Sequence, residues 1–215
     1  ELRTPMTSIR SFSEILREGE VDAEARARFA GIIHQESTRL TRLLDDLLDL
    51  SYLENGQVKL DLGQGRLADV LDRAVMAAGV SGDRLVLHRD TPREAVLIET
   101  DLERLTQVFI NLIANAAKYC DADRPELTIR VLSDSETCQV DFIDNGTPLE
   151  ADAQVLIFEK FSRLADESKA GGAGLGLAIC RQIMESLGGG ISYLPGQGGP
   201  AFRVTMRQGA RMAAQ

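Results

Sequence analysis

A series of apolar residues near the N-terminus is the feature that most restricts how this 215-residue chain can fold. From residue 29 to residue 50, one series of positions recurs in alternating steps of four and three: Phe29, Ile33, Glu36, Leu40, Leu43, Leu47 and Leu50. Such spacing is the a/d seam of a coiled coil or helical bundle, and a helix with this seam needs partners to cover it. Leu44 and Leu48 widen the stripe beyond a two-helix seam, which indicates a multi-helix core.

The residues before this seam carry a comparable stripe, so the N-terminal region is predicted to be an antiparallel helical hairpin. The stripe consists of Leu2, Met6, Ile9, Phe12, Ile15 and Leu16, and Gly19 with the polar run after it supplies the turn. Two helices make half of a four-helix bundle, so we expect a homodimer. Packing of the hairpin on the rest of its own chain is the alternative.

After Asn55 and Gly56 the long helical spacing of apolar residues gives way to short alternating or β-rich runs. This change predicts two domains, residues 1–57 and residues 58–215. In the second domain we expect strands at 58–62, 84–88, 95–99, 127–132, 138–143, 191–194 and 202–206. Helices are expected at 67–78, 101–119 and 174–187. Antiparallel strands with helices on one face make an α/β sandwich, so the whole chain is predicted to be α+β.

The charge balance excludes some classes of partner. The chain has 33 acidic and 24 basic residues, which argues against nucleic acid. No stretch approaches the roughly 20 apolar residues that cross a bilayer, so no membrane segment is expected here. The three cysteines lack C-x-x-C spacing, which favours reduced thiols in a cytoplasmic protein. Because the chain begins inside a predicted helix without Met, we expect a cytoplasmic fragment, with any membrane-bound portion upstream of it.

A glycine cluster at residues 171–176 runs directly into an amphipathic helix. Glycines let backbone amides approach phosphate oxygens, and a helix N-terminus favours an anion. The cluster lacks the Lys of a Walker A loop, because Leu177 stands in that place, and no strand leads into it as in a dinucleotide fingerprint. A flexible connector before a helix is the alternative to a phosphate site.

Two further segments carry polar groups suited to a nucleotide. Asn111 and Asn115 lie four apart on one helix face with Lys118 nearby; amide oxygens suit Mg²⁺, and the lysine suits phosphate. Asp144 ends an apolar strand beside Gly146, where its carboxylate could accept from the exocyclic amine of adenine. Solvated helix surface and an ordinary Asp-Asn-Gly turn are the respective alternatives.

In this order the segments resemble the sensor histidine kinases of two-component signalling, over essentially the whole chain. Residues 1–6 match the H-box directly after its histidine, and residues 111–119 match the N-box. The G1, F and G2 boxes correspond to residues 144–146, 158–161 and 171–176. Five motifs in family order are far more specific than any single one.

The resemblance implies a dimerisation and phosphotransfer hairpin followed by a Bergerat-type ATP-binding domain, with ATP and Mg²⁺ as ligands. Asn115 matches the Mg²⁺ ligand, and Asp144 matches the adenine-binding carboxylate. Residues 158–172 match the mobile ATP lid. The full set of nucleotide-binding residues implied is Asn111, Asn115, Lys118, Tyr119, Asp144, Gly146, Lys160, Arg163, Gly172, Gly174, Leu175 and Gly176.

The catalytic residues implied are Glu1 and Thr4. The phosphoacceptor histidine is expected one position before Glu1, which would act as its general base, and the phosphoryl group would pass to a response-regulator Asp. Thr4 matches the position that orients a water in members with phosphatase activity. Pro148 replaces the usual second glycine of the G1 box, which stiffens that loop.

Two other functions remain open on the sequence alone. One is a non-kinase ATPase of the Bergerat superfamily, against which the helical hairpin and the H-box remnant argue. The other is a catalytically silent dimeric scaffold that docks a receiver domain, against which the complete set of Asn115, Asp144 and lid glycines argues.

Overall fold

The computed structural model describes residues 2–19, 21–56, 58–80, 84–91, 96–162 and 174–208. The chain divides into two compact units, Glu1–Ser51 and Tyr52–Gln215. The boundary predicted at residue 57 stays a prediction. None of the described helices combines the length and the apolar character that a membrane span needs.

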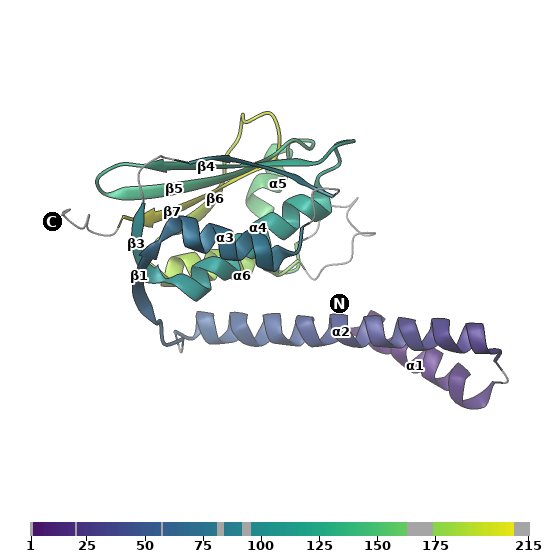
Figure 1. The fold of residues 1–215 in the computed structure, drawn as a ribbon. Coiled ribbons are helices and arrows are strands. Elements are labelled where there is room, and N and C mark those ends of the chain that lie inside the picture. The colour runs from purple at the N-terminus through teal and green to yellow at the C-terminus, as the bar shows by residue number, and fades with distance from the viewer. Residues whose placement is uncertain are drawn as a thin grey trace. The chain divides into compact units, whose positions relative to one another are not determined.

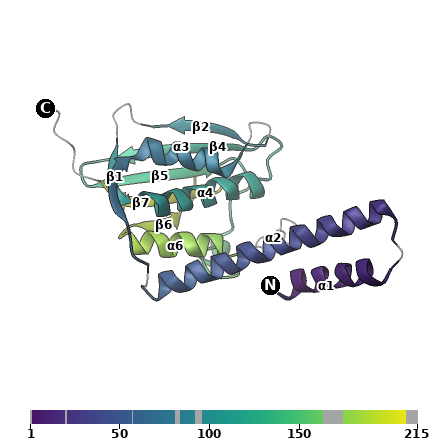
Figure 2. The same cartoon turned by 60° about the horizontal axis from the view of Figure 1, so that its bottom comes forward.

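The first unit contains the predicted hairpin, formed by α1 (Arg3–Glu18) and most of α2 (Ala23–Glu54) (Figure 2). The rings of Phe12 and Phe29 lie 5.2 Å apart between the two helices. Between the helices, the Gly19 N–H caps α1 on the Ile15 carbonyl, and the Asp22 side chain accepts the backbone N–H of Ala25 in the first turn of α2. The helical hairpin predicted from the apolar spacing is therefore confirmed.

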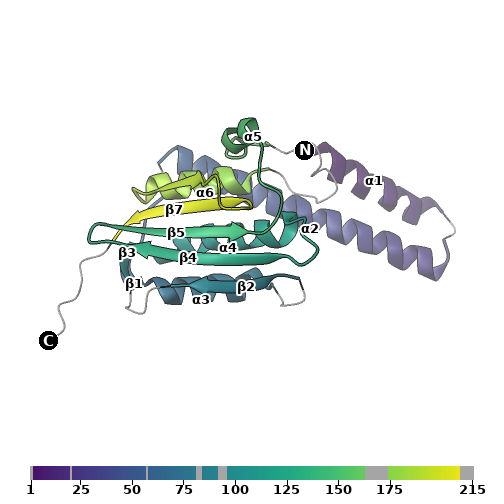
Figure 3. The ribbon, with the colours of Figure 1, turned by 90° about the horizontal axis from the view of Figure 1, so that it is seen from above.

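The second unit is built on a five-stranded sheet in the order β2-β4-β5-β7-β6, with a separate pair formed by β1 and β3 (Figure 3). The strands are β1 (Leu62–Arg66), β2 (Val86–Asp90), β3 (Leu97–Asp101), β4 (Glu126–Ser133), β5 (Thr137–Asp144), β6 (Gly190–Tyr193) and β7 (Ala201–Arg207). The helices are α3 (Leu67–Ala78), α4 (Leu102–Tyr119), α5 (Ala151–Leu156) and α6 (Gly176–Ser186). Helices α3, α4 and α6 lie on one face of the large sheet (Figure 1), which confirms the α/β sandwich.

The core lies between that sheet face and α4. Alternate residues of β5 are buried, as a strand with one covered face requires, and the Phe142 ring lies 5.2 Å from the Phe109 ring of α4. Helix α4 begins at a cap in which Asp101 accepts the backbone N–H groups of Glu103 and Arg104 at 3.1 and 3.0 Å. A cap of this kind stabilises a helix by about 1 kcal/mol. It fixes where α4 starts and hence where the asparagines of its last turns lie.

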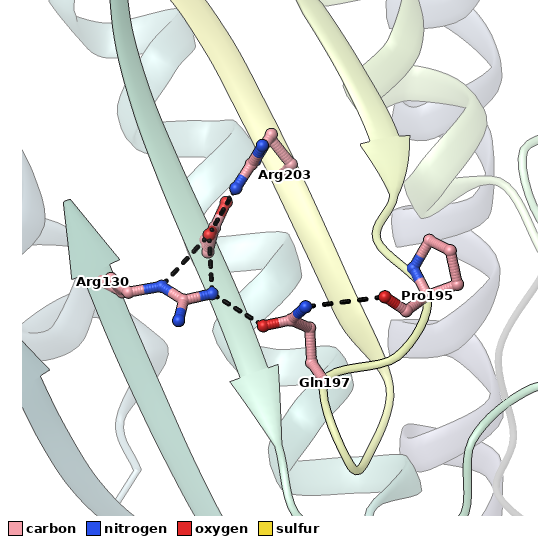
Figure 4. Close-up of polar contacts among 5 residues, drawn as sticks. Arg130, Pro195, Gln197 and Arg203 are labelled. Carbon is pink, nitrogen blue, oxygen red and sulfur yellow. Dashed lines mark hydrogen bonds and ion pairs between the residues drawn. The ribbon is translucent and has the colours of Figure 1, made fainter. Parts of the chain in front are cut away.

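The opposite face of the sheet holds a buried ion network. Asp141 of β5 is fully buried and accepts from Arg203 of β7 at 2.7 and 2.9 Å and from Arg130 of β4 at 3.3 and 3.1 Å. Arg130 also donates to Gln197, whose own amide donates to the carbonyl of Pro195 (Figure 4). The network ties three neighbouring strands to the β6–β7 loop.

Three details differ from the sequence-based expectation. Strand β2 pairs with β4 in parallel, because β3 and α4 intervene and allow a crossover. The strand expected at 58–62 instead begins at Leu62, because its partner β3 ends at Asp101, which lies opposite Leu62. The short helix α5 was not predicted; its Val155 and Leu156 are exposed, so it lacks a clear buried stripe.

Candidate nucleotide-binding site

The last turns of α4 meet the N-terminus of α6. A Cβ placed on Gly176 would lie 3.6 Å from Asn111 Oδ1, and the buried Cys180 thiol of α6 donates to the Val108 carbonyl of α4 at 3.9 Å. Asn115 follows one helical turn later and is half-buried like Asn111. The start of α6 at Gly176 thus lies directly beside the Asn111 amide.

Lys118 and Tyr119 end α4 on an exposed surface. The Lys118 ammonium donates to the Tyr119 hydroxyl at 2.8 Å and lies 4.6 Å from the centroid of its ring. The positive charge is therefore held close to the C-terminal end of α4, on the same helix as both asparagines.

Asp144, the last residue of β5, is 8% exposed, and burial raises the pKa of its carboxyl. Its Oδ1 accepts the Gly146 N–H at 2.9 Å, and its backbone N–H donates to the carbonyl of Pro200 at 3.0 Å. A Cβ on Gly199 would lie 2.0 Å from the Asp144 carbonyl oxygen, so the β6–β7 loop touches this strand end. Asp144 is a buried acceptor held from both sides.

The segments on either side of residues 163–173 are joined to each other. The Phe161 N–H donates to the Gly174 carbonyl at 2.9 Å, and both residues have positive φ, 61° and 66°. Nearby, Arg181 of α6 lies 5.0 Å over the ring of buried Phe158. These contacts attach the residues after α5 to the start of α6.

Two family models cover the two parts of the chain. Residues 1–56 match the His Kinase A (phospho-acceptor) domain, and residues 100–210 match the histidine kinase-, DNA gyrase B-, and HSP90-like ATPase domain. The chain belongs to the sensor histidine kinases of two-component systems.

Individual sensor kinases are similar in sequence to nearly the whole chain. Sensor protein KdpD of Escherichia coli is 35% identical over 97% of this chain, which spans 23% of KdpD. Sensor protein kinase WalK of Staphylococcus aureus is 33% identical over 94% of this chain, which spans 50% of WalK. The chain is thus similar to half or less of these longer sensors.

Solved histidine kinases share the fold. The Acinetobacter baumannii histidine kinase AdeS superposes with a TM-score of 0.75 at 25% identity, with 96% of each chain covered. The histidine kinase ThkA, solved in complex with the response regulator protein TrrA, gives a TM-score of 0.77 at 22% identity over 97% of this chain and 59% of that chain.

The fold brings some residues of the kinase motifs into contact and leaves others apart. Asn111 of the N-box meets Gly176 of the G2 box, and Asp144 meets Gly146 within the G1 box. Lys160 of the F-box forms an ion pair with Glu54. Thr4 is exposed in the first turn of α1, in the other unit. Glu1, Arg163 and Gly172 lie outside the described residues.

Three residues near Asp144 were missed by sequence reasoning: Cys120, Asp121 and Thr147. The Cys120 thiol donates to Asn145 Oδ1 at 3.2 Å, and Asp121 binds Thr147 through both of its oxygens. The available signal was position, because Cys120 and Asp121 directly follow the N-box and Thr147 directly follows the G1 box.

The donor set fits a nucleotide that brings its own metal ion. Among the described residues no group of three His, Cys, Asp or Glu side chains could hold a metal. Amide oxygens are hard neutral ligands, and Mg²⁺ in phosphotransfer sites takes much of its coordination from phosphates and water. The Asn111 amide oxygen, beside the N-terminus of α6, is a donor of this type.

Proposed function

We propose that this chain is an ATP-dependent histidine kinase core. It binds ATP with Mg²⁺, phosphorylates a histidine directly before Glu1, and passes the phosphoryl group to the Asp of a response-regulator receiver domain. The observation that carries the proposal is the joining of the N-box to the G2 box at Asn111 and Gly176, together with the buried carboxylate of Asp144 at the end of β5. The complex of ThkA with a response regulator supports the choice of partner.

Asp144 recognises the base. A carboxylate only accepts hydrogen bonds, so it suits the exocyclic amine of adenine. A base with a carbonyl oxygen in place of that amine would set two acceptors against each other. Its Oδ1 already accepts the Gly146 N–H, so the remaining acceptor capacity is directed by the turn that follows β5. Adenine selectivity therefore rests on how that turn is held.

Asn115, Asn111 and Lys118 serve the phosphates. When bound, Mg²⁺ neutralises charge on the transferring phosphoryl group. Asn115 holds the metal through its amide oxygen, with Asn111 beside it, and Lys118 supplies a point charge to phosphate, while Tyr119 lines the ribose side. The start of α6, from Gly174 through Leu175 to Gly176, presents backbone N–H groups to anionic oxygens.

Glu1 and Thr4 serve the acceptor. Glu1 accepts the proton of one imidazole nitrogen of the preceding histidine while the other nitrogen attacks the γ-phosphorus of ATP and ADP leaves. Thr4 orients a water in the phosphatase reaction, in which the aspartyl phosphate of the receiver domain is hydrolysed and inorganic phosphate is released. Lys160 and Arg163 act on the nucleotide from the F-box side, with Gly172 in the lid.

The active assembly is a homodimer. Met6, Ile15, Leu44 and Leu48 of the hairpin are 58, 42, 47 and 54% exposed in the single chain. Apolar side chains on both helices of one hairpin are covered when two hairpins form a four-helix bundle. This arrangement explains why the stripe of α2 is wider than one partner helix requires.

Phosphorylation of the chain extended by one histidine before Glu1 tests the proposal. With labelled ATP and Mg²⁺ we expect an acid-labile product that passes to the Asp of a receiver domain, and none from the chain that begins at Glu1. Glu1→Gln and Asn115→Ala in the extended chain should each reduce incorporation strongly, whereas Thr4→Ala should spare it and slow receiver dephosphorylation. ATP hydrolysis without any phosphohistidine would instead identify a non-kinase ATPase.

A further inference from the structure

We propose that Asp121 and Thr147 form a clasp that positions Asp144 for adenine and so sets the base selectivity of the site. This inference rests on the proposed function and deepens it. Neither residue needs to touch the nucleotide, so both are positioning residues.

The clasp is a two-point contact between distant segments. Asp121 Oδ1 accepts the Thr147 backbone N–H at 2.7 Å, and Asp121 Oδ2 accepts the Thr147 hydroxyl at 2.7 Å. Asp121 follows the end of α4, and Thr147 follows the turn after β5, 26 positions away. Hydrogen bonds from the Thr147 side chain and backbone lower the pKa of Asp121, so its carboxylate stays charged at neutral pH.

A second attachment lies on the other side of Gly146. Asn145 Oδ1 accepts the Glu126 N–H at 2.8 Å, and Asn145 Nδ2 donates to the Arg124 carbonyl at 2.9 Å. The turn that follows β5 is therefore held against the α4–β4 loop at residue 145 and again at residue 147. Gly146, between them, is held in place by its two neighbours.

Gly146 transmits this constraint to Asp144. Its N–H donates to Asp144 Oδ1 at 2.9 Å, so the orientation of the carboxylate follows the position of residue 146. A Cβ on Gly146 would lie 2.9 Å from Asp144 Oδ1 and 2.9 Å from Asp121 Oδ1. A side chain at residue 146 would therefore displace one of the two carboxylates, so the clasp and Asp144 both contact this glycine directly.

Release of the clasp would free Thr147 and allow Gly146 to shift. Asp144 would then keep its charge and its strand but lose a fixed direction for its acceptor lone pairs. The amine of adenine would gain less from such an acceptor, while the phosphate contacts on α4 and α6 would remain. The expected loss is therefore in nucleotide affinity and base selectivity, and the phosphoryl-transfer rate at saturation should not change.

The chain contains a matched control for this clasp. In the β4–β5 turn, Asp134 Oδ1 accepts the Thr137 N–H at 2.7 Å, and Asp134 Oδ2 accepts the Thr137 hydroxyl at 3.0 Å. The chemistry is the same, but this turn lies at the opposite end of β5 from Asp144. Thr137→Val and Asp134→Asn therefore report the general cost of breaking an Asp–Thr contact in this domain.

The test compares Thr147→Val and Asp121→Asn with these controls in the His-extended chain. We measure Kd for ATP and for ITP, which carries a carbonyl in place of the amine, by calorimetry with Mg²⁺, and KM and kcat for phosphorylation. Each clasp variant should weaken ATP binding about tenfold, the scale of one lost hydrogen bond. ITP binding should change less and kcat should be unchanged, Thr147→Ser should restore ATP affinity, and the controls should keep the original ATP to ITP ratio.

Two results would overturn the clasp. One is an unchanged ATP to ITP ratio in Thr147→Val and Asp121→Asn; the other is an equal change in the Thr137 and Asp134 controls. If the unmodified chain binds ATP and Asp144→Asn abolishes binding while the clasp variants behave as wild type, only the clasp is wrong. If the unmodified chain does not bind ATP, the proposed function and the clasp both fail.

Discussion

The backbone N–H of Phe161 donates to the carbonyl oxygen of Gly174 at 2.9 Å, which joins the end of the F-box segment to the residue just before α6. Phe161 takes a φ of 61°, unusual for a residue with a side chain, and Gly174 takes 66°. The contact is close as well as strained, because a Cβ on Gly174 would lie 2.5 Å from the Ser162 carbonyl oxygen. Glycine at position 174 is therefore required for two separate reasons.

Gly174→Ala should weaken ATP binding by separating the F-box segment from the start of α6. Gly188→Ala is the control, because Gly188 has a similar φ of 71° but nothing within 4 Å of an added Cβ. Both variants carry the strain of positive φ, on the order of 1 kcal/mol. A larger loss of ATP affinity in Gly174→Ala, measured by calorimetry, would show the effect of the close approach itself; equal losses would contradict it.

Asp144→Asn should abolish adenine binding without reducing the stability of the nucleotide-free protein. Burial raises the folded-state pKa of Asp144 above that of the unfolded chain, so this group favours folding at low pH and loses that contribution as pH rises through the folded pKa. At neutral pH the buried charge opposes folding, and the neutral amide removes this cost. Denaturant titration at pH 7 should show an equal or higher free energy of unfolding, whereas a large decrease would contradict the burial argument.

Local patterns predicted the parts of the fold that depend on one segment. The helix expected at 67–78 matches α3, because Leu67, Val70, Leu71 and Ala74 form a buried stripe and Gly79 ends the helix with a φ of 61°. The helical hairpin could be predicted in the same way, from the spacing of apolar residues within each of its helices. The start of β1 could not be predicted, because it depends on where the distant strand β3 ends.

In the candidate site, too, some features could be predicted from one segment and others depend on contacts between distant segments. The motifs predicted Asn111, Asp144 and Gly176 as candidate site residues, because an amide, a carboxylate and a glycine at a helix N-terminus each suit a part of a nucleotide. The contacts that orient them involve distant residues, such as the Pro200 carbonyl that accepts the Asp144 N–H. Asp121 and Thr147 belong to this second group, since nothing local shows that their segments meet.

Replacement of Leu44 and Leu48 by Glu should produce monomers that remain folded. Both side chains are about half exposed in the single chain, so their change removes little packing within it but places charges in the proposed four-helix core. Met76→Glu is the control, because Met76 is 80% exposed on α3 of the other unit. Light scattering should show a dimer for the control and a monomer for the double variant; an unmodified chain that is monomeric throughout would contradict the dimer.

Arg203→Met should destabilise the second unit more than Arg130→Met. Both guanidinium groups bind the fully buried Asp141, but the contacts from Arg203, at 2.7 and 2.9 Å, are shorter than those from Arg130, at 3.3 and 3.1 Å. Loss of the main partner of a buried charge costs about 3 kcal/mol. Denaturant titration of both variants at pH 7 gives the comparison, and an equal loss in the two would contradict the ranking.

The same network should govern the acid sensitivity of the protein. Burial alone would raise the pKa of Asp141, but the hydrogen bonds and charges of Arg203 and Arg130 outweigh it and lower the pKa. A folded pKa below the unfolded value gives stability that is present above the unfolded pKa and is lost as pH falls through the folded pKa. Asp141→Asn should therefore be less stable at neutral pH, and its free energy of unfolding should fall less between pH 5 and pH 2, a range of about 3 units around the ordinary Asp pKa. Parallel pH profiles for Asp141→Asn and the unmodified chain would show that another carboxylate dominates acid unfolding.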